Sequence, residues 1–500
     1  MSLHAQLSPE AQARFDKQRR NATISSVIIG LLGMTLLGVL LLIITMVLPS
    51  KEVPTIVTYS AGVDEQDTVE QKKVTTTTQR KPAAPSASMA KVIASTSTSA
   101  VAVPVPDVDV PEPSADFGDG SDFGAGWGSG DSGGGGDFAS LPSTMAKRCS
   151  KQDRLNRLNS NGGNAKCEDA VVKALRFLKK TQNKDGSWGQ KNHCGMTGLA
   201  LLAYLGHCET ASSEEFGVSV LDGISYLTNV SMKQNGRLAD DLKDKHWPYE
   251  HGIAVYALGE AYTMCVTVFG ENIPNLENEV KKAGQLLVDS QHASGGWDYS
   301  YDKTGKRGGD TSVSGWHLQA LKAIYHTGLP FKNIKRTERA GLEYFERLQI
   351  PSGAIGYTKG KIHDDGTTLA AVGALCFQMW DKSAHSVPRK ACRFIDKTMK
   401  FDWNTPDSDI YGHYYAAQAM INYGGEYWRR YNKLFRDQVL NNQNEDGSFK
   451  NVANNGSINA KGAQFKGTNK TAVHYRTCLA TLMLEVYYRF LPATGQKGKS

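Results

Sequence analysis

The 500-residue chain lacks most of the short patterns that mark familiar sites. Its eight cysteines are scattered with no C-x-x-C pair, which argues against a zinc ribbon and against a dense disulfide framework. We therefore expect the cysteines to be small buried residues. The sequence also has no phosphate-binding glycine loop, no serine triad pattern and no aspartate-rich diphosphate motif. Nucleotide-dependent and serine-hydrolase chemistry are not indicated.

A strong excess of one charge is missing too. The 57 Lys and Arg residues exceed the 50 Asp and Glu residues by a formal +7. The positive residues are interleaved with acidic ones along helix-like segments, which is typical of a solvated helical surface. We predict no nucleic-acid partner.

Long hydrophobic runs are absent except for one, over residues 25–49, which carries no charge. Its length predicts a single transmembrane helix; a cleaved signal peptide is the alternative, but no small-x-small site follows directly. Four basic residues precede the run, namely Arg14, Lys17, Arg19 and Arg20. Only Lys51 follows it closely. This asymmetry predicts a cytoplasmic N-terminal segment over 1–24 and an extracytoplasmic remainder, periplasmic in a two-membrane bacterium.

Residues 50–148 are rich in Thr, Pro, Gly and Ser. Such a composition buries too little apolar surface to offset chain entropy, so we predict a disordered linker. The last residues, 492–500, form a short polar tail.

Residues 149–491 show amphipathic and apolar helical patterns in strict alternation. The predicted outer, amphipathic helices lie near 165–181, 215–231, 275–291, 335–349, 384–400 and 428–442. The predicted inner, apolar helices lie near 194–206, 250–268, 311–327, 366–380, 410–423 and 471–490. Because an all-apolar helix must be enclosed, this alternation predicts two layers. The expected fold is an all-α toroid of about six helix hairpins.

A short pattern recurs at the junctions: Gln, then Gly four residues on, then a bulky residue two further. The four copies begin at Gln182, Gln291, Gln349 and Gln443. The first, over 173–188, resembles the QW repeat of squalene-hopene and oxidosqualene cyclases at every specified place. The resemblance covers about 165–491 and implies the α/α toroid of the terpenoid cyclase and protein prenyltransferase superfamily.

In that superfamily the N-terminal ends of the inner helices line the active cavity. The resemblance therefore implies that the following residues line a cavity or binding site: His251, Asp310, Trp316, His317, Asp409, His413, His474 and Arg476. Helix capping is the alternative explanation for Asp310 and Asp409.

The cyclases protonate an alkene with the middle Asp of an Asp-x-Asp-Asp motif. Here the matching stretch reads Ile362-His363-Asp364-Asp365, so the first Asp is missing. Asp364, with Asp365 and His363, is the candidate acid group, but the loss of one carboxylate weakens that chemistry, and helix capping is the alternative.

The prenyltransferases hold a zinc ion, with a last ligand in a His-Thr-Cys sequence. This chain has Arg476-Thr477-Cys478 there, and arginine cannot ligate a metal. His474 and Cys478, one turn apart, are expected to be a core pair. We therefore predict neither a metal nor another cofactor.

Aromatic residues lie on or beside the predicted inner helices and could line a pocket or simply fill the core: Trp316, Tyr357, Phe377, Tyr411, Tyr414, Tyr415 and Tyr475. Three functions stay open. The domain binds a lipid, peptide or glycan partner without a complete catalytic motif; it is an isoprenoid cyclase or transferase with Asp364 as general acid; or it is a structural subunit of an envelope complex. The expected partners are an isoprenoid lipid or an envelope protein.

Overall fold

The computed structural model describes residues 148–358, 366–405, 407–451 and 469–489. The predicted cytoplasmic segment, membrane helix and nearly all of the linker lie outside these ranges, as do His363, Asp364 and Asp365. None of the helices within the described ranges is both long and apolar enough to span a bilayer.

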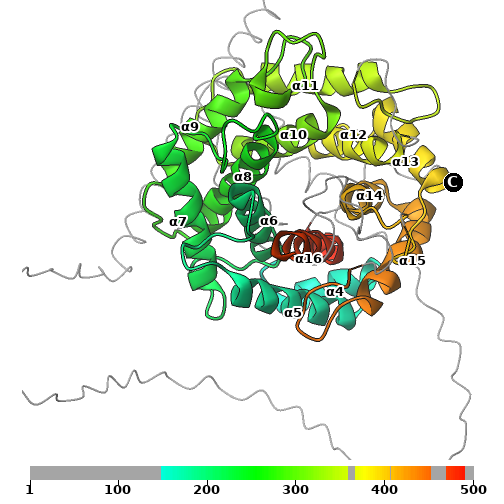
Figure 1. Ribbon diagram of the computed structural model, residues 1–500. Coiled ribbons are helices and arrows are strands. Elements are labelled where there is room, and N and C mark those ends of the chain that lie inside the picture. The colour runs from blue at the N-terminus through cyan, green and yellow to red at the C-terminus, as the bar shows by residue number, and fades with distance from the viewer. Residues whose placement is uncertain (1–147, 359–365, 406, 452–468, 490–500) are drawn as a thin grey trace, which may run out of the picture. The chain divides into compact units, whose positions relative to one another are not determined.

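The described chain is helical, and its main helices form two concentric rings (Figure 1). The outer ring contains α5 (Ala165–Thr181), α7 (Gly217–Lys233), α9 (Leu276–Asp289), α11 (Ile334–Leu348), α13 (Ser386–Thr398) and α15 (Gly425–Asn441). The inner ring contains α6 (His193–Gly206), α8 (Pro248–Ala261), α10 (Thr311–His326), α12 (Thr367–Met379), α14 (Ile410–Tyr423) and α16 (Lys470–Leu484). The predicted toroid of six helix pairs is confirmed.

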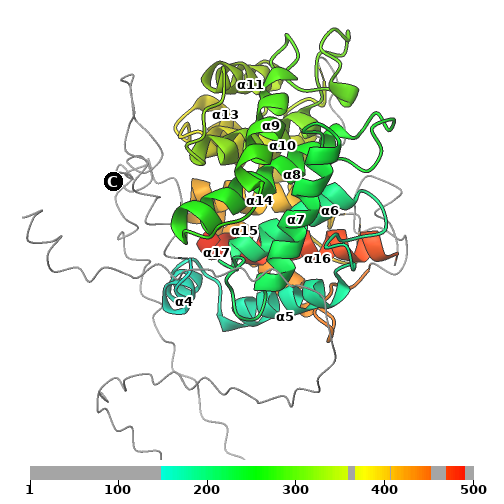
Figure 2. The same cartoon turned by 90° about the vertical axis from the view of Figure 1, so that its left-hand side faces the viewer.

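Short elements add to this plan at the ends of the rings. The predicted inner helix 250–268 changes at its end into a π-helical segment, Tyr262–Val268, and the predicted helix 471–490 stops at Leu484. A second piece, α17 (Val486–Arg489), follows and packs near α4 (Lys151–Ser160), which the sequence patterns did not reveal; Figure 2 shows both at one end of the ring.

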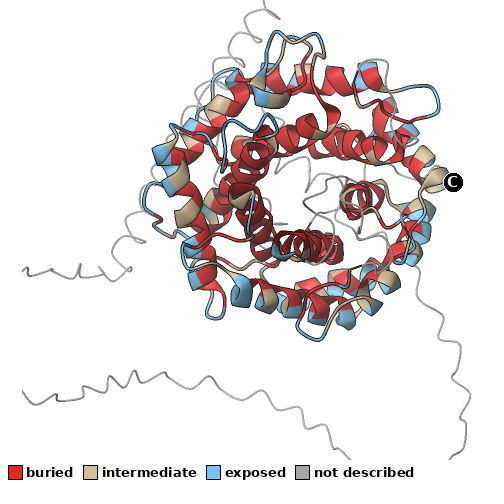
Figure 3. Cartoon of the chain, viewed as in Figure 1, coloured by how far each residue is buried: buried red, intermediate tan, exposed pale blue. Residues whose placement is uncertain are grey.

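Burial separates the two layers as the hydrophobic patterns require (Figure 3). In the inner helix α6, 13 of 14 residues are buried, whereas in the outer helix α11 only 8 of 15 are. A helix enclosed on all sides needs apolar residues all round, while its covering partner needs only one apolar stripe. The alternation read from the sequence is therefore the alternation of inner and outer layers.

The repeated glutamines join neighbouring hairpins. In the second copy, Gln291 Nε2 donates to Gly295 O at 2.7 Å within its own loop and to Thr337 O on the next outer helix at 2.8 Å. In the last copy, the Gln443 amide donates to Ala170 O at 2.7 Å, on the first outer helix. The copies at Gln182 and Gln349 make the equivalent pairs of bonds. The same junction thus links successive hairpins and closes the ring.

The tryptophans of the first two copies are fixed in the same way. Trp188 Nε1 donates to Leu178 O at 2.7 Å, and Trp297 Nε1 donates to Leu287 O at 2.8 Å, ten residues upstream in each case. Both indoles are fully buried. Each polar edge finds a carbonyl while the ring fills the gap between layers, which makes these residues structural.

The glycines of the motif have a geometric reason. Gly447 has φ +92°, and a Cβ placed there would overlap the backbone carbonyl of Lys173 on the first outer helix. Only glycine satisfies both the left-handed conformation and the close approach of two backbones.

Cysteine usage differs from the prediction at two positions. Cys149 and Cys208 form a disulfide, with a Cα–Cα distance of 5.0 Å, that ties the segment before α4 to the end of α6. The other six cysteines are free and buried, as expected. Scattered spacing conceals a single long-range bridge, because connectivity depends on the fold.

Charges are buried near the C-terminal ends of the inner helices. Glu260, at the end of α8, accepts bonds from Arg148 at 2.9 Å and from Arg489 at 2.6 Å, and Arg489 also lies 3.5 Å from Glu485. These four groups are nearly inaccessible to solvent. Paired in this way, they bind α17 and the segment before α4 to the inner ring.

Candidate functional site

The inner helices run parallel, so that their N-terminal ends share one face of the ring. Gly195 N at the start of α6 lies 3.4 Å from Glu250 Oε2 at the start of α8. Thr368 at the start of α12 donates to Asp409 Oδ2, before α14, at 3.0 Å. We call the N-terminal ends of the inner helices, with the loops that precede them, the mouth face. The repeated Gly-x-Trp loops lead directly into it.

Asp310 is the buried carboxylate at the start of α10. Its Oδ1 accepts a bond from Val313 N at 2.9 Å, the expected helix cap, and lies 3.4 Å from the Tyr249 hydroxyl. Its Oδ2 faces Arg307 Nη2 at 3.7 Å. Burial raises the pKa of Asp310, and the Tyr357 hydroxyl, the Val313 N–H and Arg307 oppose that rise.

The groups around Asp310 are what this part of the mouth face presents to solvent. The hydroxyls of Tyr299 and Tyr357 lie 2.6 Å apart, and the Arg307 guanidinium covers the Tyr299 ring at 3.8 Å from its centroid. Arg307 also pairs with Asp298, and its side chain is 33% exposed. Asp310 itself is inaccessible, and its bonds hold the phenols and the guanidinium in front of it.

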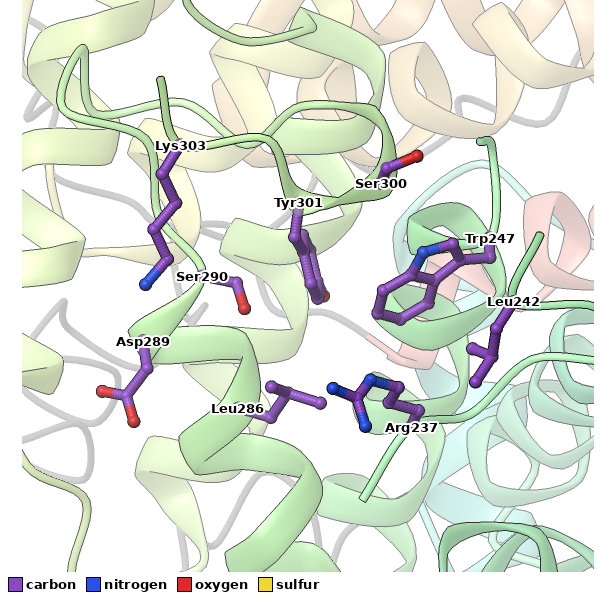
Figure 4. Close-up of a pocket in the computed structure, with 9 residues that line it drawn as sticks. All are labelled: Arg237, Leu242, Trp247, Leu286, Asp289, Ser290, Ser300, Tyr301 and Lys303. Carbon is purple, nitrogen blue, oxygen red and sulfur yellow. The ribbon is translucent and has the colours of Figure 1, made fainter. Parts of the chain in front are cut away.

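A pocket of about 410 Å³ adjoins this cluster (Figure 4). Its lining consists of Arg237, Leu242, Trp247, Leu286, Asp289, Ser290, Ser300, Tyr301 and Lys303. The rings of Trp247 and Tyr301 meet edge to face, with centroids 4.7 Å apart, and the Arg237 and Leu286 side chains approach them (Figure 4). The pocket volume falls within the range of small-ligand sites, about 300–1,000 Å³.

The loop that forms one wall of the pocket has an unusual backbone. Ser300 and Tyr301 both have φ 53°, the left-handed region that residues other than glycine rarely occupy. Ser300 N donates to Lys245 O at 2.8 Å, and the Tyr301 hydroxyl bonds His317 Nε2 at 2.8 Å. Such conformations persist only where the surroundings enforce them, and they concentrate at functional sites.

The pocket and the Asp310 cluster are built from the same two segments of the chain. Trp247 lines the pocket while Tyr249 reaches Asp310, and Tyr301 lines the pocket while Tyr299 belongs to the cluster. In both cases the two residues are two positions apart in the chain.

Two of the predicted site histidines, His251 and His317, lie behind this pocket. His317 Nδ1 donates to Val313 O at 2.8 Å, so Nε2 of the neutral ring accepts a bond from the Tyr301 hydroxyl. His251 Nδ1 accepts a bond from Leu238 N at 3.2 Å. Both are fully buried, and burial lowers the pKa of each to about 3. They are neutral groups that support the pocket wall.

The other two, His413 and His474, are held in the packed interior. His413 bonds the Tyr431 hydroxyl at 2.8 Å through Nδ1 and two backbone carbonyls through Nε2. His474 donates to Met196 O at 2.9 Å and lies 3.3 Å from Cys478 Sγ, the expected core pair. Burial lowers the pKa of both to about 4.

Trp316 belongs to a buried aromatic cluster on the inner ring. Its ring stacks on Tyr414, with centroids 5.4 Å apart, and meets Tyr415 edge-on. The hydroxyls of both tyrosines bond the Gln319 amide, at 3.1 and 2.9 Å. These rings pack against one another with their polar ends satisfied, as a core does.

The remaining predicted residues are also near the mouth face. Asp409 makes no capping bond with its side chain and instead accepts the Thr368 hydroxyl across to α12. Arg476 Nε donates to Phe449 O at 3.1 Å, and burial lowers the pKa of Arg476 to about 10. No finding tests these residues, or the four histidines, as ligand contacts.

Sequence reasoning missed the residues that line the pocket. The missed signal is the aromatic-rich stretch that follows the second repeat, Tyr299 to Tyr301, together with the Trp247-Pro248 step that opens α8. The first is a single 3-10 turn and the second is the start of a helix, and no periodic pattern reveals the course of either.

No protein-family model matches the sequence, and no curated protein is significantly similar to it. Among solved structures, an inactive variant of an alpha-1,6-mannanase of Salegentibacter sp. HEL1_6, in complex with alpha-1,6-mannotetrose, aligns with TM-score 0.45 at 8% identity. A protein from Actinoplanes aligns with TM-score 0.28 at 12% identity. Each alignment covers 65% of this chain and 99% of the other. Likenesses this weak indicate nothing about activity, and the cyclase and prenyltransferase family stays a prediction.

Proposed function

We propose that the toroid binds an oligosaccharide at its mouth face, with one sugar unit in the pocket lined by Trp247 and Tyr301. The observation that carries the proposal is the lining of that pocket: two aromatic rings together with an arginine, a lysine, a carboxylate and two serines. A sugar ring offers apolar C–H faces and a rim of hydroxyls. Aromatic walls suit the first, and convergent polar groups suit the second.

The Asp310 cluster extends this site. Arg307, Tyr299 and Tyr357 supply donors and acceptors next to the pocket, held in place by a buried carboxylate. Hydroxyl-rich ligands need many such groups at fixed positions, since each bond replaces one to water. An oligosaccharide longer than one unit would use both parts.

An isoprenoid ligand fits the described residues less well. The mouth face carries charges and phenols, and the inner aromatic cluster around Trp316 is closed by its own packing. The proposed acid Asp364 lies outside the described residues. Nothing in the described parts of the chain favours the cyclase alternative.

Placement of the domain belongs to the same proposal. The proposal includes the predicted membrane helix over 25–49 and an extracytoplasmic toroid that residues 50–148 tether to it. A flexible linker of that length has a root-mean-square span of roughly 50–60 Å, so the domain could reach glycans or envelope proteins well away from its anchor.

The test is a binding measurement on the full chain in detergent micelles against an array of neutral and acidic oligosaccharides, followed by titration of the best ligand. The double variant Arg237→Ala and Lys303→Ala changes two exposed pocket side chains and should leave the fold intact. We expect its affinity to fall about tenfold or more.

The matched control is Arg336→Ala with Arg339→Ala, which removes two exposed cations from the outer helix α11. Its affinity should equal that of the unmodified chain. Equal affinity in both double variants, or no oligosaccharide bound at all, would contradict the proposal.

A further inference from the structure

A second cluster of chemistry-bearing side chains lies on the mouth face, between α6 and α8. Cys194, Asp240 and Glu250 each point one ligand atom to a common place, and these three atoms all lie within 4.8 Å of one another. They come from three separate segments: the start of α6, the loop between α7 and α8, and the first turn of α8. Asp240 and Glu250 both reach the first turn of α6 from other segments, where they accept backbone N–H groups of His193 and Gly195.

The donors are mixed in kind. A thiol and two carboxylates are the set that zinc accepts, at about 2.3 Å to sulfur and about 2.0–2.2 Å to oxygen. In a tetrahedral site those lengths put neighbouring ligand atoms about 3.6 Å apart. Because the three atoms already lie within 4.8 Å of one another, a shift of at most about 1 Å would bring them to that separation.

The side chains have the freedom to make that movement. Each hydrogen bond that Glu250 accepts is long: 3.3 Å from Asn192 Nδ2, 3.3 Å from Asp240 N and 3.4 Å from Gly195 N. Bonds of this length are weak. The Glu250 carboxylate is thus buried but loosely held.

Glu250 and Cys194 are buried, and Asp240 has a basic partner. Glu250 is 5% exposed. The pair of Asp240 is His193, whose Nδ1 lies 2.6 Å from Asp240 Oδ2. Burial raises the pKa of both the Glu250 carboxyl and the Cys194 thiol, so a bound divalent cation would replace their protons.

Asp240 also has the supports expected of a ligand. Its Oδ2 accepts the His193 backbone N–H at 2.9 Å as well as the imidazole, so one side of the carboxylate is fixed. Hydrogen bonds of this type orient ligands and tune their basicity. The Asp240 side chain is 25% exposed, which gives a path from solvent.

We propose that Cys194, Asp240 and Glu250 bind one Zn²⁺ ion, with His193 orienting Asp240 and the fourth coordination position open toward the mouth face. Three protein ligands with one open position are typical of zinc sites that bind a water or a substrate group. This revises the sequence-based prediction of no metal, which found no convincing ligand pair on the inner helices.

The site is joined to the pocket by the loop between α7 and α8. Arg237 and Leu242 of this loop line the pocket, and Asp240 between them turns to the three-residue cluster. Metal binding should therefore also order one wall of the pocket. The zinc site does not depend on the oligosaccharide proposal, because its donors are complete without a ligand in the pocket.

The experiment uses the full chain without a histidine tag, stripped with a chelator under reducing conditions and titrated with Co²⁺. We expect one Co²⁺ per chain and a thiolate-to-cobalt charge-transfer band, because the Cys194 sulfur would be a ligand. Zn²⁺ should displace the cobalt and remove the band.

Variants at the cluster decide the assignment. Cys194→Ser should abolish the charge-transfer band, and Glu250→Gln should lower Co²⁺ affinity at least tenfold while retaining the band. His193→Gln should lower the affinity about 10- to 100-fold. Circular dichroism of each metal-free variant shows whether it has folded. If Cys194→Ser does not fold, Glu250→Gln alone tests the assignment.

The control is Cys376→Ser, which changes another buried free thiol far along the chain. It should keep the band and the affinity. The proposal is overturned if the unmodified chain binds no Co²⁺ or shows no thiolate band, or if Cys194→Ser and Glu250→Gln bind Co²⁺ as well as Cys376→Ser does.

Discussion

The four Gln-Gly junctions and the six inner-helix N-termini lie next to each other, yet they have opposite characters. At each junction the glutamine makes the same two bonds, to its own loop and to the next outer helix. By contrast, the starts of α6, α8 and α10 carry different groups, namely a thiol, a loosely bonded carboxylate and a helix-capping carboxylate.

This difference separates the residues that build the ring, which we call construction, from the residues available for ligand binding, which we call chemistry. A residue that repeats with the same partners in every hairpin is needed for the ring itself. A residue that occurs in one hairpin only, and that is polar, buried and imperfectly bonded, has to be explained by something other than the ring. The predictions below are arranged to break this distinction, from the largest expected effect to the smallest.

Trp297→Ala should lower the free energy of unfolding most, by about 3–5 kcal/mol, because it leaves a large cavity and an orphaned carbonyl between the layers. Urea unfolding followed by circular dichroism measures it. Phe269→Ala, at a side chain 45% exposed, is the control and should cost less than 1 kcal/mol. A small loss of unfolding free energy in Trp297→Ala would mean that the junctions do not stabilise the ring.

Gly447→Ala tests ring closure. A methyl group there would overlap the Lys173 carbonyl and would also force alanine into a left-handed conformation, so we expect a loss of about 2–4 kcal/mol. Gly270→Ala separates the two causes, since Gly270 has φ +66° but nothing within 4 Å. Its loss should be about 1 kcal/mol. Equal losses in the two variants would show that the first and last hairpins are not in close contact.

The buried histidines predict a pH dependence. The pKa of His413 is lowered to about 4 in the folded state, so the unfolded state binds more protons between about pH 4 and 6.5. Stability should therefore fall as the pH drops through that window, by about 2 kcal/mol at pH 5 for His413 alone. His413→Asn should reduce the loss of unfolding free energy between pH 7 and pH 5. His246→Asn, which changes a half-exposed ring, should leave that loss unchanged.

Asp310→Asn should change stability least, within about 1 kcal/mol, because asparagine caps a helix as well as aspartate does. The same change removes the charge that faces Arg307, so oligosaccharide affinity should fall several-fold. Calorimetric titration beside a melting curve measures both effects. A large drop in melting temperature with unchanged affinity would show that Asp310 stabilises the ring and does not support ligand binding.

Most of the fold could be predicted from the sequence, and the site could not. The helix pairs follow from hydrophobic periodicity, and the closure of the ring follows from the repeat, as Gln443 and Ala170 show. Helix ends were less predictable: the π-helical segment after Ala261 and the short helix α4 have no distinctive pattern.

The site was harder to predict from the sequence than the fold, for two physical reasons. A buried histidine and a ligand-binding histidine look alike in a sequence, so His413 and His474 were chosen without knowledge of their backbone partners. Conversely, Asp240 and Cys194 are 46 residues apart and share no motif, and only the fold brings them together.

The most direct test of the central claim compares one junction variant with one mouth-face variant in two assays. Gln443→Ala should lose about 1–3 kcal/mol of stability through its two broken bonds and should bind oligosaccharide with unchanged affinity. The Arg237→Ala and Lys303→Ala double variant should melt like the unmodified chain and bind at least tenfold more weakly. If both variants lose stability and affinity together, junction and mouth face are one unit, and the separation of construction from chemistry is wrong.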